Sequence, residues 1–185
     1  MKKLITIIVL VGIGWVVLNF TKPYTKEAEM GTDPMNISYE IQGRQIKLTN
    51  GKAELEIAPG SASREKIAIW GQFVKADLDK DGDEDAVAYL TQETRGSGVF
   101  FYVVVALNEN GKWLGTNAMF LGDRIAPQNI NIFDGKAVAN FAERMASENF
   151  TVRPSVGKSV WIYIDKPRMQ IGEAVQNFEG ESRSE

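Results

Sequence analysis

The 185-residue sequence contains no cysteine and no histidine. Without cysteine, the chain has no disulfide, no thiolate zinc site and no cysteine nucleophile. Without histidine, it lacks the most common general base, which excludes Ser-His-Asp hydrolysis and histidine-based metal catalysis. The net charge of −3 gives no reason to expect a nucleic-acid partner. These absences exclude many classes of enzyme.

One apolar run without a charge, Leu4 to Phe20, follows Lys2 and Lys3. Its length is near the minimum for a membrane-spanning helix and is long for a signal-peptide core. No small-x-small cleavage site follows, so residues 1–22 are predicted to be a membrane anchor or uncleaved signal. A cleaved signal, which would make the protein secreted, and a buried helix are the alternatives.

The two lysines predict which side of the membrane the rest of the chain occupies. Basic residues hold the flank of a spanning helix in the cytoplasm. We therefore expect a single-pass protein of the plasma (inner) membrane, with its N-terminus in the cytoplasm and its C-terminal domain outside. Residues 23–35 include Pro23, Gly31 and Pro34 and are typical of a linker.

From residue 36 to residue 165 the apolar residues alternate with polar ones, which is typical of β-strands. Asn50 and Gly51 separate two such runs and predict a hairpin. The nine apolar residues of 99–107 predict a strand that is covered on both faces. Strands are expected at 37–41, 46–48, 53–57, 63–75, 86–90, 99–107 and 159–164, with a hairpin over 130–141.

These short strands and close turns predict a mainly β fold. The expected architecture is a single antiparallel barrel or sandwich-like domain over residues 36–165, behind an N-terminal transmembrane helix. Residues 166–185 show no periodicity and are predicted to be a mobile tail.

The segment 77–85, with the sequence DLDKDGDED, holds six acidic residues and one lysine. Alternate aspartates followed by a glycine at the sixth position are typical of calcium loops, because the glycine permits the sharp turn. An EF-hand would need a bidentate glutamate at the twelfth position, which is Ala88 here. The pattern instead fits the shorter D-x-D-x-D-G-x-x-D loop. The predicted metal ligands are side-chain oxygens of Asp77, Asp79, Asp81 and Asp85 and the backbone carbonyl of Asp83.

This loop resembles the calcium loops of dockerins and of FG-GAP repeats. The single copy does not suit a propeller, which needs several. Calcium modules outside the cell bind with dissociation constants of about 0.1–1 mM. At ~1 mM free calcium, the tighter value stabilises the fold by about 1.4 kcal/mol, which suits a structural ion. The alternative is a solvated acidic turn without metal; a glycosidase-type carboxylate pair would need a wider separation.

The chain also resembles a family of small uncharacterised exported bacterial domains, over most of residues 36–165. The most specific stretch is GDRIAPQ, at 122–128. The other matching stretches are AELEIAPGSAS (53–63), ADLDKDGDEDAVAYLTQ (76–92), RGSGVFFYVVVAL (95–107), GTNAMFLGDRIAPQ (115–128) and PSVGKS (154–159). The resemblance implies an exported domain and implies no activity.

Ser-Lys chemistry is the remaining hydrolytic option in a chain without histidine. Ser155 with Lys158 and Ser63 with Lys66 have the S-x-x-K spacing. In penicillin-binding enzymes this motif begins a helix and needs partner motifs, which are missing here. We therefore predict that the protein is not an enzyme. The expected function is that of a membrane-anchored, calcium-stabilised β domain that binds an unknown protein or envelope ligand.

Overall fold

The computed structural model describes residues 30–174 of the chain, and the predicted anchor at Leu4–Phe20 lies outside this range. Within the described range, no helix has the length and apolar character needed to cross a bilayer. The strands are β1 (Ser38–Ile41), β2 (Arg44–Lys47), β3 (Lys52–Glu56), β4 (Arg64–Ala76), β5 (Asp85–Glu93), β6 (Val99–Glu109), β7 (Lys112–Gly115), β8 (Met119–Asp123), β9 (Ala126–Phe133), β10 (Lys136–Glu143), β11 (Val156–Asp165) and β12 (Gln170–Glu173). Short 3-10 turns, η1 (Pro34–Asn36) and η2 (Lys166–Arg168), precede β1 and follow β11.

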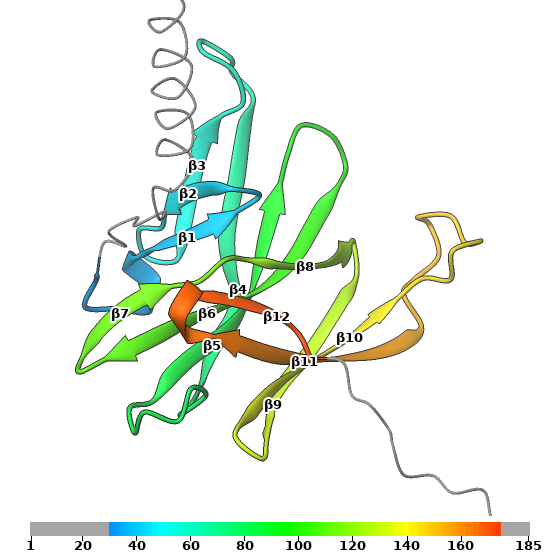
Figure 1. Ribbon diagram of the computed structural model, residues 1–185. Helices are drawn as coiled ribbons and strands as arrows, with labels where there is room; N and C mark the ends of the chain where they lie inside the picture. Colours follow the sequence, from blue (N-terminus) through cyan, green and yellow to red (C-terminus); the bar gives the residue numbers. More distant parts are fainter. Residues whose placement is uncertain (1–29, 175–185) are drawn as a thin grey trace, which may run out of the picture.

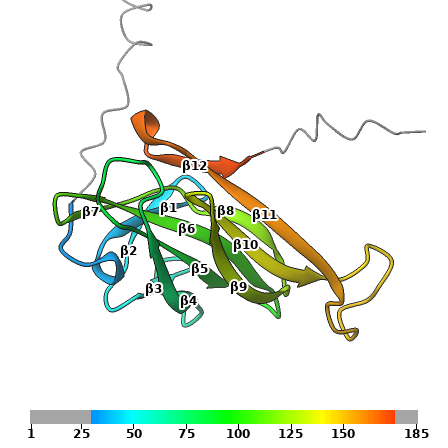
Figure 2. The ribbon, with the colours of Figure 1, turned by 90° about the horizontal axis from the view of Figure 1, so that it is seen from below.

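The strands form three antiparallel sheets arranged in layers (Figures 1 and 2). The large sheet has the order β3-β4-β5-β6-β7, with β8 also pairing with β6. A second sheet has the order β12-β11-β10-β9, and β1 pairs with β2 alone. The mainly β, antiparallel character of the prediction is confirmed, and no sheet of the described residues closes into the barrel that was one of its two forms.

Strands β5 and β6 form the centre of the molecule and are buried on both faces. On one face, Leu90 and Val104 pack against the β1–β2 pair. On the other face, Val103 and Val105 pack against the second sheet. The prediction of a doubly covered strand at 99–107 is confirmed, because consecutive side chains of a strand point to opposite sides.

The Asn50–Gly51 turn is present, but the hairpin predicted around it is wrong. Both residues have positive φ, 52° and 73°, and Thr49 N–H donates to the Lys52 carbonyl over 2.8 Å. Beyond this turn the strands separate, since β2 pairs with β1 and β3 pairs with β4. The reason is that the chain passes here between layers: Ile46 of β2 packs in the core beneath the large sheet, whereas β3 forms the edge of that sheet.

Of the other predictions along the chain, a hairpin and a strand are confirmed and the start of the tail is wrong. Strands β9 and β10 form the predicted hairpin around Asp134–Gly135, and the strand predicted at 63–75 corresponds to β4. The predicted tail begins too early, because residues 166–174 form η2 and β12 and belong to the domain. Strand β12 has only one buried apolar side chain, Ile171, and therefore carries no alternating pattern.

Candidate metal centre

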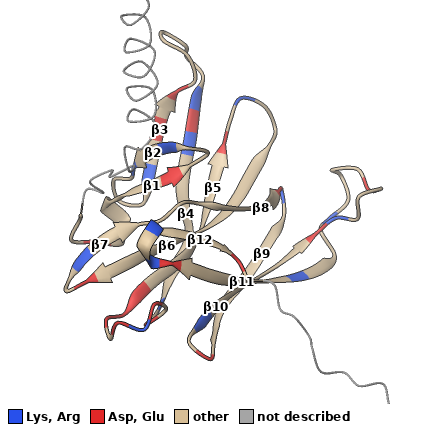
Figure 3. Cartoon of the chain, viewed as in Figure 1, with Lys and Arg blue, Asp and Glu red and all other residues tan. Residues whose placement is uncertain are grey.

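The acidic segment forms the loop between β4 and β5, as predicted, and Asp85 is the first residue of β5. Figure 3 shows this loop mostly in red at the lower end of the large sheet. Gly82 has φ of 99°, a conformation that favours glycine because a side chain would be strained there. The sixth position of the loop is thus occupied by the residue type that the turn requires.

The carboxylates of Asp77, Asp79 and Asp81 accept hydrogen bonds from backbone N–H groups of the same loop. Asp77 accepts hydrogen bonds from the N–H groups of Asp81 and Gly82, both at 3.1 Å. Asp79 Oδ1 accepts from Asp81 N–H at 3.2 Å, and Asp81 Oδ1 accepts from Asp83 N–H at 2.9 Å. These bonds hold the carboxylates around the inside of the turn.

Asp77, Asp79 and Asp85 form the first carboxylate group, with one oxygen of each within 4.8 Å of the others. The Asp85 side chain is buried and accepts hydrogen bonds from the N–H groups of Leu78 and Asn108, both at 2.9 Å. Burial is the main cause that raises the pKa of Asp85 to about 6. A cation beside this carboxylate would offset the cost of burying its charge.

Asp79, Asp81 and Glu109 form the second group, and a lysine lies among them. The Lys166 ammonium is 2.8 Å from Asp79 Oδ2, 2.7 Å from Asp81 Oδ2 and 3.0 Å from Glu109 Oε1. The carboxylates raise the pKa of Lys166, and its ammonium is the main cause that lowers the pKa of Asp81. The position that an external cation would take is therefore partly taken by a side chain.

Asp79 is the member common to both groups. Its side chain is 1% exposed, and Oδ2 accepts no hydrogen bond of good geometry from any described residue, although it is ion-paired with Lys166. A buried carboxylate oxygen generally has either a hydrogen-bond donor or a cation beside it. For Asp79 Oδ2 that cation is the Lys166 ammonium, which an external ion would have to displace or share this oxygen with.

Asp83 differs from the other predicted ligands in the direction of its side chain. Its Oδ2 accepts a hydrogen bond from Asn110 N–H at 2.8 Å, in the turn between β6 and β7. The backbone carbonyl of Asp83, which the loop pattern predicts as a ligand, stays a prediction. The side chain instead joins the acidic loop to the neighbouring turn.

Glu109 and Lys166 belong to the site but are absent from the predicted ligand set. Glu109 ends β6, and the antiparallel pairing of β5 with β6 brings this end beside the acidic loop. That position could have been inferred from a hairpin between the runs 86–90 and 99–107. Lys166 lies outside the alternating region, and no sequence pattern indicates its place.

The Ser-Lys pairs lie on strands or next to them. Lys158 is in β11 and forms an ion pair with Glu143 at 2.7 Å, and Ser155 precedes this strand. Lys66 is in β4, directly opposite Glu93 of β5, and Ser63 precedes β4. Neither motif begins a helix, the context that this pattern has in penicillin-binding enzymes.

Comparisons of the chain with protein-family models, curated proteins and solved structures give no match.

Proposed function

We propose that the protein is a membrane-anchored, extracytoplasmic β domain in which the β4–β5 loop binds one structural calcium ion. The observation that supports this most is the convergence of Asp77, Asp79 and Asp85, two of which have buried side chains. Three carboxylates held so close repel one another unless a cation neutralises them. The resemblance to dockerin and FG-GAP loops supports the same proposal.

The donor set favours calcium over other metals. All the candidate ligands are oxygens, and calcium takes six to eight oxygen ligands in flexible geometry. Zinc sites generally use cysteine or histidine, and the sequence has neither. Magnesium prefers octahedral geometry and retains several waters, which a loop with many carboxylates does not require.

The ion would stabilise a junction in the large sheet. Asp85 bonds the backbone of Leu78 within the loop and that of Asn108 on β6, and Asp83 bonds that of Asn110. A cation held by the loop would therefore fix the β4–β5 connection against the end of β6. The role in the cell would be binding of a protein or envelope ligand through another surface, with Leu4–Phe20 in the membrane.

A metal-free domain with a purely structural role is the second candidate. Lys166 favours it, because its ammonium already neutralises part of the charge of Asp79 and Asp81. The two candidates differ in what calcium does to stability, and thermal unfolding can separate them.

The test is thermal unfolding of the full chain in detergent, with 1 mM calcium and with a chelator. We expect calcium to raise the melting temperature by about 3–6 °C, as ~1.4 kcal/mol of stabilisation does in a domain of this size. The double variant Asp79→Asn with Asp81→Asn should lose this rise. Asp134→Asn, in the exposed β9–β10 turn, is the matched control and should keep it. Equal melting temperatures with calcium and chelator would favour the metal-free domain.

A further inference from the structure

The outward face of the second sheet carries exposed aromatic side chains. Ile130 of β9 and Ile162 of β11 point into the core, so the residues that alternate with them face outward. The solvent-facing side of an antiparallel sheet is generally polar. Here Phe133 and Tyr163 are 66% and 58% exposed, and Trp161 is partly exposed. Apolar side chains grouped on a surface in this way mark an interaction site.

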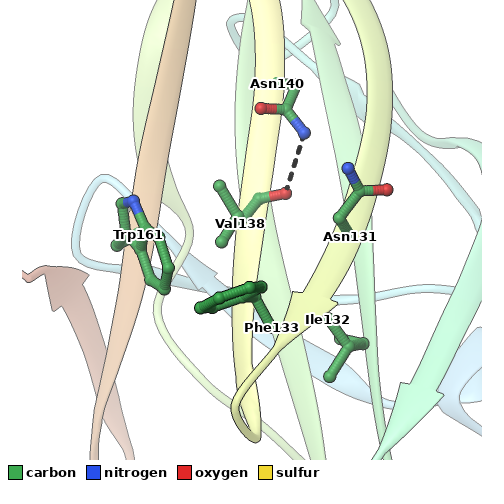
Figure 4. A pocket seen from close by; sticks show the side chains of 6 residues that line it. All are labelled: Asn131, Ile132, Phe133, Val138, Asn140 and Trp161. Carbon is green, nitrogen blue, oxygen red and sulfur yellow. Dashed lines mark hydrogen bonds between the residues drawn. The ribbon is translucent and has the colours of Figure 1, made fainter.

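An open pocket of about 410 Å³ lies on this face. Figure 4 shows Trp161 of β11 and Asn131 of β9 on either side of Val138 of β10, with the Phe133 ring below Val138. The Phe133 and Trp161 ring centroids are 5.7 Å apart, and the ring planes cross at 87°. The two rings therefore form walls that meet nearly at a right angle. The residues that line the pocket are Asn131, Ile132, Phe133, Val138, Asn140 and Trp161.

Amide and hydroxyl groups border the aromatic walls. The Asn140 amide donates to Asn129 Oδ1 over 2.8 Å, and the Ser159 hydroxyl donates to Asn140 Oδ1 over 2.6 Å. The exposed Asn131 side chain forms no hydrogen bond with any described residue. An amide side chain offers two N–H donors and one acceptor oxygen. Asn131 thus presents both kinds of group beside the rings.

All six residues that line the pocket are uncharged. Lys136, which pairs with Phe133 across the β9–β10 hairpin, lies outside the lining. A charged ligand would lose hydration in this pocket without gaining a partner of opposite charge, which is costly. The pocket therefore favours a neutral ligand that has both an apolar surface and hydrogen-bonding groups.

We propose that this pocket binds one ring of a neutral carbohydrate. The C–H groups on the face of a sugar ring would pack against Trp161 and Phe133, because an aromatic face is electron-rich. The hydroxyl groups at the edge of the sugar would exchange hydrogen bonds with the amide of Asn131. The volume is in the range of small-ligand sites, about 300–1,000 Å³, whereas a protein partner needs roughly 800 Å² of surface.

This inference gives the chemical class of the envelope ligand and rests on the proposed function for the location of the domain outside the cell. The calcium loop contributes no residue to the pocket. The double variant Asp79→Asn with Asp81→Asn should therefore keep saccharide binding while it loses the calcium-dependent rise in melting temperature. The two readouts allow either proposal to fail while the other stands.

The test is titration of the full chain with two neutral saccharides, cellotetraose and the N-acetylglucosamine tetramer, followed by calorimetry. The detergent must have a headgroup other than a sugar, because a sugar headgroup would compete for the pocket. We expect at least one tetramer to bind, and the one that binds more tightly distinguishes a glucan from an amino-sugar glycan as the source. A tetragalacturonate, which is acidic, should bind at least tenfold more weakly.

Variants of the aromatic walls and of the amide test the assignment of the pocket. Phe133→Ala and Trp161→Ala should each weaken binding roughly tenfold, and Asn131→Ala roughly three- to tenfold. Phe133→Tyr keeps the ring and should bind within about twofold of the wild type. Phe120→Ala removes a side chain of similar exposure, 56%, from β8 of the large sheet and is the matched control.

Three results would overturn the proposal. The first is that the wild type binds neither neutral tetramer at millimolar concentration. The second is that Phe133→Ala and Asn131→Ala, which change exposed residues and should fold, bind as the wild type does. The third is a wild-type dimer that Phe133→Ala dissociates, without saccharide binding, which would make a second copy of the chain the occupant.

Discussion

The Lys166 ammonium lies 2.8 Å from Oδ2 of Asp79, although 87 positions separate the two residues in the sequence (166 − 79). Lys166 begins η2, directly after the last residue of β11. A cationic side chain from one end of the domain thus enters an acidic loop that is expected to hold calcium. The Lys166 ammonium and a bound calcium ion would both neutralise the carboxylates of Asp79 and Asp81, so the two cations compete for the same oxygens.

Replacing this lysine should strengthen calcium binding. In Lys166→Gln the competing charge is removed, so we expect the dissociation constant for calcium to fall roughly two- to fivefold, the size expected for one exposed ion pair. Isothermal titration of the full-length variant measures this change. Lys136→Gln, at the exposed start of β10, is the control and should bind as the wild type does. Weaker binding by Lys166→Gln would show that the lysine supports the site.

The buried Glu65 should make stability depend on acid pH. Its carboxylate receives two hydrogen bonds from Arg44, at 2.6 and 3.0 Å, and one from Gln92 at 2.6 Å. The bonds from Arg44 are the main cause that lowers the pKa of Glu65 below its ordinary value of 4.5. This contribution is therefore complete above pH 4.5 and is lost as the pH falls through the lower, folded-state pKa.

The variant Glu65→Gln isolates this effect. At pH 7 it should lower the free energy of unfolding by about 1–2 kcal/mol, because Arg44 loses its charged partner but stays half exposed. Below pH 4 the difference from wild type should shrink, as measured by urea denaturation across the acid range. Glu54→Gln, on exposed β3, controls for the loss of one charge. A difference that stays constant with pH would contradict the assignment.

A tyrosine hydroxyl links the two main sheets. Tyr89 of β5 donates to the backbone carbonyls of Asn129 at 2.9 Å and Asn140 at 2.7 Å, on β9 and β10. Tyr89→Phe should therefore lower the free energy of unfolding by about 1 kcal/mol, measured by urea denaturation. Tyr163→Phe removes an exposed hydroxyl of β11 and should change stability little. Equal effects of both variants would mean that the link between the sheets is unimportant.

The parts of the fold that follow from local patterns were predictable. The run 99–107 is apolar on both sides of the strand, and its burial on both faces follows directly from that. Asn50 and Gly51 correctly predict a turn but not the partners of the strands beside it. Turn chemistry fixes the local backbone, whereas the choice between one sheet and two depends on contacts distant in sequence.

The candidate site likewise has one part that local sequence patterns predict and one part that they do not. The aspartates of 77–85 and Gly82 are close in sequence, so their spacing alone predicts the loop. Glu109 lies at the site because β5 pairs with β6, and Lys166 lies there because of the position of the second sheet. Contacts of this kind require the whole fold, and a single sequence does not encode them as a pattern.

Isothermal titration of the full chain with calcium chloride tests the central proposal most directly. We predict one binding site with a dissociation constant of about 0.1–1 mM, and no binding by the double variant Asp79→Asn with Asp81→Asn. The Asp134→Asn control should bind as the wild type does. Absence of a binding heat in the wild type, or an unchanged heat in the double variant, would contradict the assignment of calcium to this loop.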